Sequence, residues 1–384
     1  MKSNYKRLGD LINTVSVKNT DMITDDLRGV NYQKYFMPSV ANTIGVDLSG
    51  YKVIKNGQFA CNLMHVGRDE CLPIALHRDE KPIIVSPAYF SFEVKDESEI
   101  LSEFLFLWFK RAEFDREACF YTDADVRQGL IKSSFFDMKI PVPPIEEQRK
   151  IVAEYQAVER RIENNRRLIA TLEATAQTIY RKMFVDNIDP NNLPQGWRMG
   201  TIGDLGRIVT GKTPSSSCPE DFGNYMEFIT PGEFKDENIY LNSATRKLSV
   251  EGVNKLNSKI LPQNSIAVTC IGYVGKVCVV DKEAISNQQI NTIIPHDEYS
   301  YTYVYFCVKD KASELQSIAV GASTLPMLSK KEFEQVNIPI PSIKKLKVFW
   351  SATNDIFKLS LALHNENNLL DQILNLLLLQ LSNY

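Results

Sequence analysis

A seven-residue repeat of apolar side chains most constrains how this chain can fold. Neither Gly nor Pro occurs between Glu146 and Val185, and apolar or small residues recur there in alternating steps of four and three. This spacing predicts a helix that packs lengthwise on another helix. At 1.5 Å per residue the helix would be roughly 50–60 Å long, which is too long for the core of one compact domain. The seam positions are Ile151, Tyr155, Val158, Ile162, Asn165, Ile169, Leu172, Ala176, Ile179 and Met183.

A second helix with the same pattern is predicted at the C-terminus. Phe349 follows Ile151 by 198 residues, and each later seam position keeps that offset. In a fully overlapped antiparallel pair of these helices, Asn165 and Asn367 lie opposite each other. A lone polar pair in an apolar seam fixes helix register at some cost in stability, so we predict that these two side chains touch. The second seam consists of Phe349, Thr353, Ile356, Ser360, Leu363, Asn367, Leu370, Leu374, Leu377 and Leu381.

The segments before the two helices are also duplicated, which predicts two similar domains. Leu8-Gly9-Asp10-Leu11 returns as Ile202-Gly203-Asp204-Leu205, and both copies end in Ile-Pro-X-Pro. We therefore predict an α+β chain in which two globular mixed α/β domains are separated by two long antiparallel, coiled-coil-like helices, with a pseudo-twofold internal repeat. The expected order is domain 1–145, helix 146–185, domain 186–343 and helix 344–384. Strands are expected at 51–54, 83–85, 89–94, 266–269, 277–280 and 290–294, and further helices at 99–111 and 300–315.

Composition limits the classes of function without choosing one. The net charge of −3 does not indicate a nucleic-acid-binding protein, but it is compatible with a basic surface alongside acidic ones. No apolar run reaches membrane-spanning length, and the N-terminus leads into no apolar signal segment. Seven Cys, an odd number without CxxC spacing, favour reduced thiols in the cytoplasm over disulfides or a zinc site.

One motif favours an enzyme instead. Residues 206–213 satisfy GxxxxGK[ST], the loop through which P-loop NTPases bind phosphate. That chemistry requires a strand before the loop and a helix after it. Here Ile208 and Val209 have strand character inside the loop, and a Pro- and Ser-rich stretch, 214–219, follows it. A P-loop NTPase is therefore an alternative from a different class, and we identify no other catalytic motif.

Polar side chains on loops are the more informative functional signal. Asn and Gln can bind adenine through two hydrogen bonds, Arg and Lys can bind guanine or phosphate, and Gly lets the backbone approach phosphate. Such residues occur at corresponding places in both domains, although ordinary turn chemistry explains any single one of them equally well. The DNA-binding candidates are Asn62, His65, Arg68, Ser86, Tyr89, Arg127, Gln128, Lys212, Thr213, Thr269, Tyr273, Lys276, Asn287, Gln288, Gln289, Ser323 and Thr324.

Charged and polar residues on the first long helix are candidates for docking other subunits. The alternative is that they form the solvated face of a helix pair, and a helical scaffold with no DNA role is a further alternative. The docking candidates are Glu146, Glu147, Gln148, Arg149, Arg160 and Arg161.

Three segments together resemble a known family. The run Pro141-Val142-Pro143-Pro144-Ile145-Glu146-Glu147-Gln148-Arg149-Lys150-Ile151-Val152 is similar to the central-region motif of type I restriction-modification specificity subunits. The segments Gly211-Lys212-Thr213-Pro214 and Asn287-Gln288 are similar to other motifs of that family. The likeness covers nearly the whole chain. It departs at 342–346, where Ser-Ile-Lys-Lys-Leu replaces the usual Pro-Leu/Ile-Glu-Glu-Gln.

The resemblance implies a DNA-reading subunit that catalyses no reaction itself. Each domain would be a target recognition domain for one half of a split site on double-stranded DNA. Two methyltransferase (M) subunits, which carry S-adenosylmethionine, would bind the helices, and restriction/motor (R) subunits would join them for host defence. No cofactor or metal is implied for this chain. The alternative within the family is a specificity subunit that serves a methyltransferase without a nuclease partner.

Overall fold

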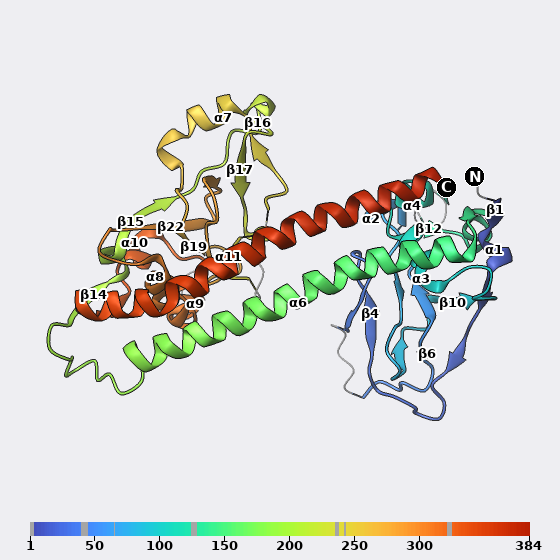
Figure 1. Ribbon diagram of the computed structural model, residues 1–384, viewed down its shortest axis with the longest axis horizontal. Coiled ribbons are helices and arrows are strands. Elements are labelled where there is room, and N and C mark those ends of the chain that lie inside the picture. The colour runs from blue at the N-terminus through green and yellow to red at the C-terminus, as the bar shows by residue number, and fades with distance from the viewer. Residues whose placement is uncertain are drawn as a thin grey trace. The chain divides into compact units, whose positions relative to one another are not determined.

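The chain folds into two compact units, each containing one globular part and a portion of both long helices. The structure, a computed structural model, describes residues 4–39, 45–64, 66–123, 129–234, 238–241, 243–320 and 325–384. Unit 1 comprises Met1–Arg160 and Asp371–Tyr384, and unit 2 comprises Arg161–Leu370. The units are labelled by their elements in Figure 1.

Unit 1 is built on a four-stranded antiparallel sheet with the order β2-β10-β7-β8. The sheet β3-β6-β9 and the pairs β1-β13, β4-β5 and β11-β12 complete it. Its strands are β1 (Asn4–Arg7), β2 (Ile12–Thr14), β3 (Val17–Lys18), β4 (Arg28–Val30), β5 (Phe36–Pro38), β6 (Lys52–Ile54), β7 (Gln58–Cys61), β8 (Ile74–Leu76), β9 (Ile83–Val85), β10 (Phe90–Val94), β11 (Thr122–Asp123), β12 (Gly129–Leu130) and β13 (Lys139–Val142). Its short helices are α1 (Leu8–Leu11), α2 (Val66–Asp69), α3 (Ser102–Phe109), α4 (Ala112–Phe120) and α5 (Lys132–Asp137).

Aromatic side chains form the core of unit 1. Phe59 of β7 stacks on Phe92 of β10 with ring centroids 4.8 Å apart, because directly paired residues of adjacent strands point to the same face. Phe109 of α3 meets both rings edge-on. Offset-stacked and edge-on pairs add stability beyond the area that they bury.

Unit 2 repeats this plan. Its main sheet has the order β15-β22-β19-β20, beside the sheet β16-β18-β17-β21 and the pair β14-β23. Its strands are β14 (Arg198–Thr201), β15 (Gly206–Thr210), β16 (Phe222–Gly223), β17 (Met226–Ile229), β18 (Lys247–Leu248), β19 (Ile266–Thr269), β20 (Val277–Val279), β21 (Ala284–Ser286), β22 (Ile290–Pro295) and β23 (Asn337–Ile340). Its short helices are η2 (Ile202–Leu205), η3 (Pro219–Asp221), η4 (Pro231–Glu233), α7 (Val250–Lys255), η5 (Asn257–Lys259), α8 (Tyr301–Asp310), α9 (Ala312–Val320) and α10 (Lys330–Glu334).

The predicted internal duplication is present at the level of strand pairing. Each main sheet joins four strands in the same order, and each unit pairs its first strand with the strand before its long helix. A parallel backbone pairing also occurs in both units: Leu27 forms a parallel bridge with Ile84 in unit 1, and Phe228 pairs in parallel with Ile285 in unit 2. All six predicted strands occur within about one residue of their expected bounds.

The two predicted helices 99–111 and 300–315 were only partly right. The first is shorter and corresponds to α3. The second is divided into α8 and α9 at Lys311, whose backbone N–H bonds to Val308 O rather than continuing the helix ladder. No Gly or Pro marks that break in the sequence, so nothing local predicts it.

The two long helices predicted from the seam are confirmed as α6 (Ile145–Phe184) and α11 (Ile343–Gln380), the latter followed by the turn η6 (Leu381–Asn383). Every predicted seam position on both helices is buried or half-buried, as a packed helix face requires. Glu146 and Glu147 lie in the first turn of α6, where the helix dipole favours negative charge.

Within unit 2, the segments of α6 and α11 run antiparallel. Near the C-terminal end of α6, the Phe184 ring lies 5.2 Å from that of Phe349 at the start of α11. Farther along, Arg161 pairs with Glu366. Within unit 1 the direction is the same, since the Tyr384 hydroxyl donates to Glu147 at 2.6 Å.

Two further observations concern the described part of the chain. None of its helices combines the length and apolarity needed to cross a membrane. None of its seven cysteines forms a disulfide.

Candidate nucleic-acid interface

The loop between β19 and β20 is the most prominent candidate in unit 2. Tyr273 stands near its tip with 80% of the side chain exposed, and Lys276 lies on the same loop with its Nζ 5.9 Å from the centre of the Tyr273 ring. Gly272 and Gly275 have φ angles of +77° and +91°, in a region that residues other than glycine rarely adopt. An aromatic face and a cation therefore lie together at the surface, a combination that can stack on a base and bind the neighbouring phosphate.

Thr269, another candidate, supports this loop from within and is not at the surface. Its side chain is 0% exposed, and its hydroxyl donates to the Tyr273 carbonyl while accepting the Lys276 N–H at 3.1 Å. The prediction that Thr269 contacts DNA is therefore wrong for the side chain. It is a buried residue that closes the loop, because its strand runs directly into the turn.

A second loop pair lies beside β15. Gly211 packs so closely on the Ser286 and Asn287 carbonyls that an added Cβ would collide with both. This approach brings Thr213 to Gln288, whose amide oxygen accepts the Thr213 hydroxyl at 2.5 Å. The Gly211-Lys212-Thr213-Pro214 and Asn287-Gln288 segments are thus brought together by the fold.

The exposure of these residues separates surface candidates from structural ones. Lys212 and Gln288 are exposed, and Gln289 is half-buried. Asn287 is buried, and its side chain donates to Gln289 at 2.8 Å and accepts the Gln289 backbone N–H at 3.0 Å. Asn287 therefore shapes the turn, and the prediction that its side chain reads a base is corrected.

The same element identifies the phosphate-loop motif as a false match. Residues Gly206–Thr210 form strand β15, which is paired along its length with β22. Residues 211–217 after it contain no helix, so no helix N-terminus faces the Lys212 side chain. The P-loop NTPase alternative therefore lacks the geometry on which it depends.

In unit 1 the corresponding candidates line the ends of β7 and β9. The Tyr89 hydroxyl accepts the Val30 N–H at 3.4 Å, and Ser86 accepts the Ala88 N–H at 3.3 Å. Asn62 caps the next turn by accepting the Met64 N–H at 3.0 Å. These side chains are half-buried, with turn-forming contacts as well as exposed surface.

One charged side chain, that of Arg68, completes the described candidates of unit 1. Arg68 of α2 is exposed and forms a two-pronged ion pair with Asp69 at 2.7 and 3.1 Å. His65, Arg127 and Gln128, like Ser323 and Thr324 of unit 2, lie outside the residues that the structure describes.

One basic residue was missed by the sequence argument. Burial lowers the pKa of Lys52, and the nearby positive charge of Lys132, at the start of α5, lowers it further. Lys52 donates to the Tyr89 carbonyl at 2.5 Å, and the Lys132 ammonium lies 4.5 Å from the ring centre of the adjoining Phe90. The duplication offers the only sequence signal, since Lys132 corresponds to Lys330.

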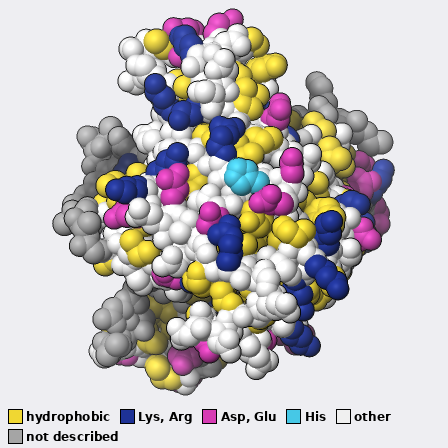
Figure 2. Space-filling view, turned by 90° about the vertical axis from the view of Figure 1, so that its left-hand side faces the viewer, with side chains coloured by type: hydrophobic (Ala, Val, Ile, Leu, Met, Phe, Trp, Pro, Cys, Tyr) yellow, Lys and Arg dark blue, Asp and Glu magenta, His cyan; other side chains and the backbone are white. Residues whose placement is uncertain are grey.

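The surface charge is mixed. On the face shown in Figure 2, Lys and Arg side chains are scattered among acidic ones and form no single continuous basic field. Among the described residues, no three His, Cys, Asp or Glu side chains gather as metal ligands. On this face, DNA contacts would depend on small groups of cations such as those on the loops above.

The docking candidates on α6 divide into surface and buried residues. Glu146, Glu147, Arg149 and Arg160 are exposed, and Arg149 pairs with Glu146. Arg161 is exposed but bonds bidentately to Glu366 at 2.7 and 3.1 Å. Gln148 is 0% exposed, so its assignment to a docking surface is wrong.

Gln148 instead attaches α6 to the globular part of unit 1. Its side chain accepts the Leu101 N–H at 2.9 Å and donates to the carbonyls of Glu99 and Pro143 at 2.9 and 2.8 Å. These backbone groups would otherwise be unsatisfied. The corresponding position in unit 2, Leu346, is buried without such bonds from its side chain.

The predicted contact between the seam asparagines is present. Asn165 Nδ2 donates to Asn367 Oδ1 at 3.0 Å, and both side chains are buried, at 3% and 9% exposure. Asn165 also bonds to Glu366 and, with Arg161, lowers the pKa of that carboxyl. The contact is therefore part of a small polar network in an otherwise apolar seam.

Comparisons with known proteins agree with this arrangement. The sequence matches the family model described as "Type I restriction modification DNA specificity domain" twice, over residues 2–174 and 194–374. The type I restriction enzyme HindI specificity subunit of Haemophilus influenzae is 26% identical over 424 residues, which cover 91% of this chain and 91% of that protein. The MjaIX specificity subunit of Methanocaldococcus jannaschii is 31% identical over 156 residues, covering 40% of this chain and 36% of the relative.

A solved structure shares the fold. The type I restriction-modification system S subunit from M. genitalium is 15% identical and superposes with a TM-score of 0.57, covering 99% of this chain and 96% of that one. The two stretches matched by the family model coincide with the two copies of the internal repeat.

Proposed function

This chain belongs to the type I restriction-modification DNA specificity family and carries two of its recognition domains, and we propose that each domain reads one half of a two-part DNA site. The supporting observation is the repeated strand order, which places the same loops at the same position in both units. Two readers on one chain gain effective concentration once the first half-site is bound, provided that the spacing is right. The proposed domains are 1–145 and 186–343.

In unit 2 the reading surface consists of Lys212, Thr213, Tyr273, Lys276, Gln288 and Gln289. The exposed amide of Gln288 suits an adenine edge in the major groove, and the lysines suit phosphates or guanine. Thr269 and Asn287 hold the loops beneath this surface. Specificity then depends on loop shape as much as on any one contact.

In unit 1 the surface consists of Asn62, Arg68, Ser86 and Tyr89, joined by Lys52 and Lys132. Burial lowers the pKa of Lys52, and repulsion from the neighbouring Lys132 ammonium in the free protein lowers it further. A phosphate placed between them would relieve that repulsion. This half of the interface is therefore best suited to grip the DNA backbone beside Tyr89.

The long helices are proposed to act as an antiparallel, coiled-coil-like spacer that sets the unread gap, with Asn165 and Asn367 fixing its register. Two methyltransferase subunits, carrying S-adenosylmethionine, and restriction/motor subunits would dock on the helices. The exposed residues Glu146, Glu147, Arg149 and Arg160 form the proposed docking surface at α6. The first turn of α11 carries Lys344 and Lys345 instead of acidic residues, so the two helix starts offer different charges.

The chain itself supplies recognition, as its family of specificity subunits does, and performs no reaction. Methylation of a base requires its extrusion from the stack, which the methyltransferase partner would carry out. A double-stranded DNA partner and seven cysteines that form no disulfide favour a cytoplasmic location.

Salt-dependent binding tests this function. Fluorescence anisotropy with the full-length chain should give a log–log dependence of affinity on salt, because phosphate contacts release counterions. Replacing Lys212 with Ala should weaken binding to all sequences and lower the magnitude of the salt slope by about 1. Lys358→Ala, on the exposed face of α11, is the matched control and should leave the slope unchanged. Affinity that is independent of both salt and sequence would contradict the proposal.

A further inference from the structure

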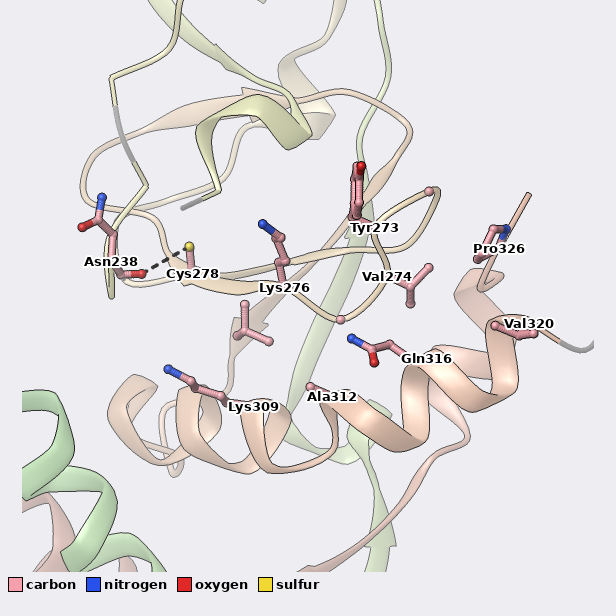
Figure 3. A pocket seen from close by; sticks show the side chains of 13 residues that line it. Asn238, Tyr273, Val274, Lys276, Cys278, Lys309, Ala312, Gln316, Val320 and Pro326 are labelled. Carbon is pink, nitrogen blue, oxygen red and sulfur yellow. Dashed lines mark hydrogen bonds between the residues drawn. The ribbon is translucent and has the colours of Figure 1, made fainter. Parts of the chain in front are cut away.

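Tyr273 is exposed in a way that folding of unit 2 does not require. Large aromatic side chains usually bury most of their surface, yet this ring is 80% exposed. Figure 3 shows that it projects from the loop on the side away from α9, while Gln316 of α9 points toward the loop from the other side. The ring therefore faces outward, where it contributes little to the core.

The backbone beneath Tyr273 is held firmly. The Gly275 N–H donates to the Thr269 carbonyl at 2.9 Å, and the buried Thr269 hydroxyl donates to the Tyr273 carbonyl. The Gly272 N–H donates to the Pro326 carbonyl at 2.9 Å, which ties the tip to a distant segment of unit 2. Little entropy is left to lose when the ring meets a ligand.

Helix α9 supports the loop from behind. A Cβ on Gly275 would lie 3.0 Å from the Ala312 carbonyl oxygen, so the glycine backbone packs directly on the start of that helix. Beyond this contact, a cavity of about 520 Å³ separates the loop from α9 and is lined in part by Lys309, Gln316 and Val320.

Lys276 indicates which ligand suits the ring. Its ammonium lies 5.9 Å from the ring centre, close enough to reach a phosphate adjoining a base that stacks on Tyr273. We propose that Tyr273 is an aromatic wedge that stacks against a base step of the half-site read by unit 2 and partly unstacks it, while Lys276 holds the neighbouring phosphate. This inference rests on the proposed DNA-reading function and adds a mechanism of recognition to it.

An aromatic wedge would affect which DNA sequences unit 2 prefers. Unstacking a base step costs least at flexible pyrimidine–purine steps, so the position under Tyr273 contributes specificity without a base-edge hydrogen bond. The tyrosine hydroxyl is dispensable in this mechanism and the ring is not. A hydrogen-bonding tyrosine would behave in the opposite way, and that difference decides the experiment.

The test uses the full-length chain and a duplex carrying its methylation motif, with 2-aminopurine placed in turn at each position of the half-site. Wild-type chain should raise the fluorescence at one step, and Tyr273→Phe should do the same. Tyr273→Ala should abolish the rise and weaken binding about 10- to 100-fold, the usual loss for one base–aromatic stack. Lys276→Ala should retain the rise, weaken binding to all sequences alike and lower the magnitude of the salt slope by about 1.

The controls separate failure of the wedge from failure of the function. Tyr225→Ala removes another exposed tyrosine of unit 2 and should keep the fluorescence rise. Unchanged affinity and fluorescence in Tyr273→Ala, with specific binding intact, overturn the wedge alone, as does loss of both in Tyr273→Phe. If the wild-type chain shows no sequence-specific, salt-dependent binding, the proposed function fails and the wedge fails with it.

Discussion

The buried pair Asn165 and Asn367 allows the most quantitative prediction. Replacing Asn165 with Ala removes a 3.0 Å hydrogen bond and leaves the Asn367 amide unpaired at 9% exposure. A buried polar group without a partner costs about 1–3 kcal/mol, so unit 2 should lose about 2 kcal/mol of stability. Replacing both asparagines with Leu should restore or exceed the original stability, because an apolar pair avoids that cost.

Register should respond differently from stability. With Leu at both positions, no buried asparagine pair favours the native alignment over one shifted by a heptad, which moves one helix by about 10 Å. Spin labels attached through non-natural amino acids at the exposed positions Thr171 and Leu359 report this distance within unit 2. We expect a narrow distance distribution in the wild type and a broader one in the double Leu variant.

Urea unfolding followed by hydrogen exchange in unit 2 measures the stability part. Ser360→Ala is the matched control, because this buried hydroxyl donates to the Ile356 carbonyl of its own helix and its removal leaves no side chain of the partner helix without a hydrogen bond. Its cost should stay below about 1 kcal/mol. A double Leu variant that is destabilised, or one with an unchanged narrow distance distribution, would refute the role assigned to the pair.

Three further predictions follow from single residues. Gln148→Leu, which places the Leu346 side chain of the repeat at this position, should lower the stability of unit 1 by at least about 2 kcal/mol, because three backbone groups lose their partner. Unfolding followed by the fluorescence of buried Trp108 measures this loss, and the exposed control Arg149→Ala should be near neutral. Burial lowers the pKa of His364 to about 4, so the unfolded chain takes up a proton that the folded chain refuses as the pH falls below about 6.5. The free energy of unfolding of unit 2 should therefore fall by about 2 kcal/mol between pH 7 and pH 5. His364→Asn should abolish this fall, and the exposed control His296→Asn should preserve it. A pH profile in His364→Asn that is identical to that of the wild type would contradict the assignment. Gly211→Ala should cost about 1–3 kcal/mol and weaken DNA binding, because its Cβ collides with the Ser286 and Asn287 carbonyls, whereas Gly50→Ala, which meets no atom within 4 Å, should be tolerated. Wild-type unfolding and DNA affinity in Gly211→Ala would show that the two loops are not coupled.

The sequence predicts the parts of this fold that depend on repetition. Alternating four- and three-residue steps specify α6 and α11 because a helix presents one face at that period, and the single polar position in the seam identifies the Asn165–Asn367 contact. The duplication gives the second unit from the first. Strands such as β9 are recognisable because they are short and uniformly apolar between turn residues.

The sequence does not predict which polar side chains are buried. Gln148, Thr269 and Asn287 all look like surface residues. Gln148 bonds to distant backbone groups such as the N–H of Leu101, whereas Thr269 and Asn287 bond to groups within their own loops. The break at Lys311 and the Lys52–Lys132 pair likewise depend on packing between distant segments. A local pattern carries no information about the long-range partners of Gln148, and it does not show that the loops of Thr269 and Asn287 turn these side chains inward.

The most direct test of the central claim is the methylated motif itself, read by long-read sequencing of DNA from cells that express the chain with its partner subunits. We expect a two-part motif with a fixed gap. Exchanging residues 1–145 for those of a relative should change one half of the motif and leave the other half and the gap unaltered. A continuous motif, or an exchange that rewrites both halves, would contradict the account of one half-site for each unit.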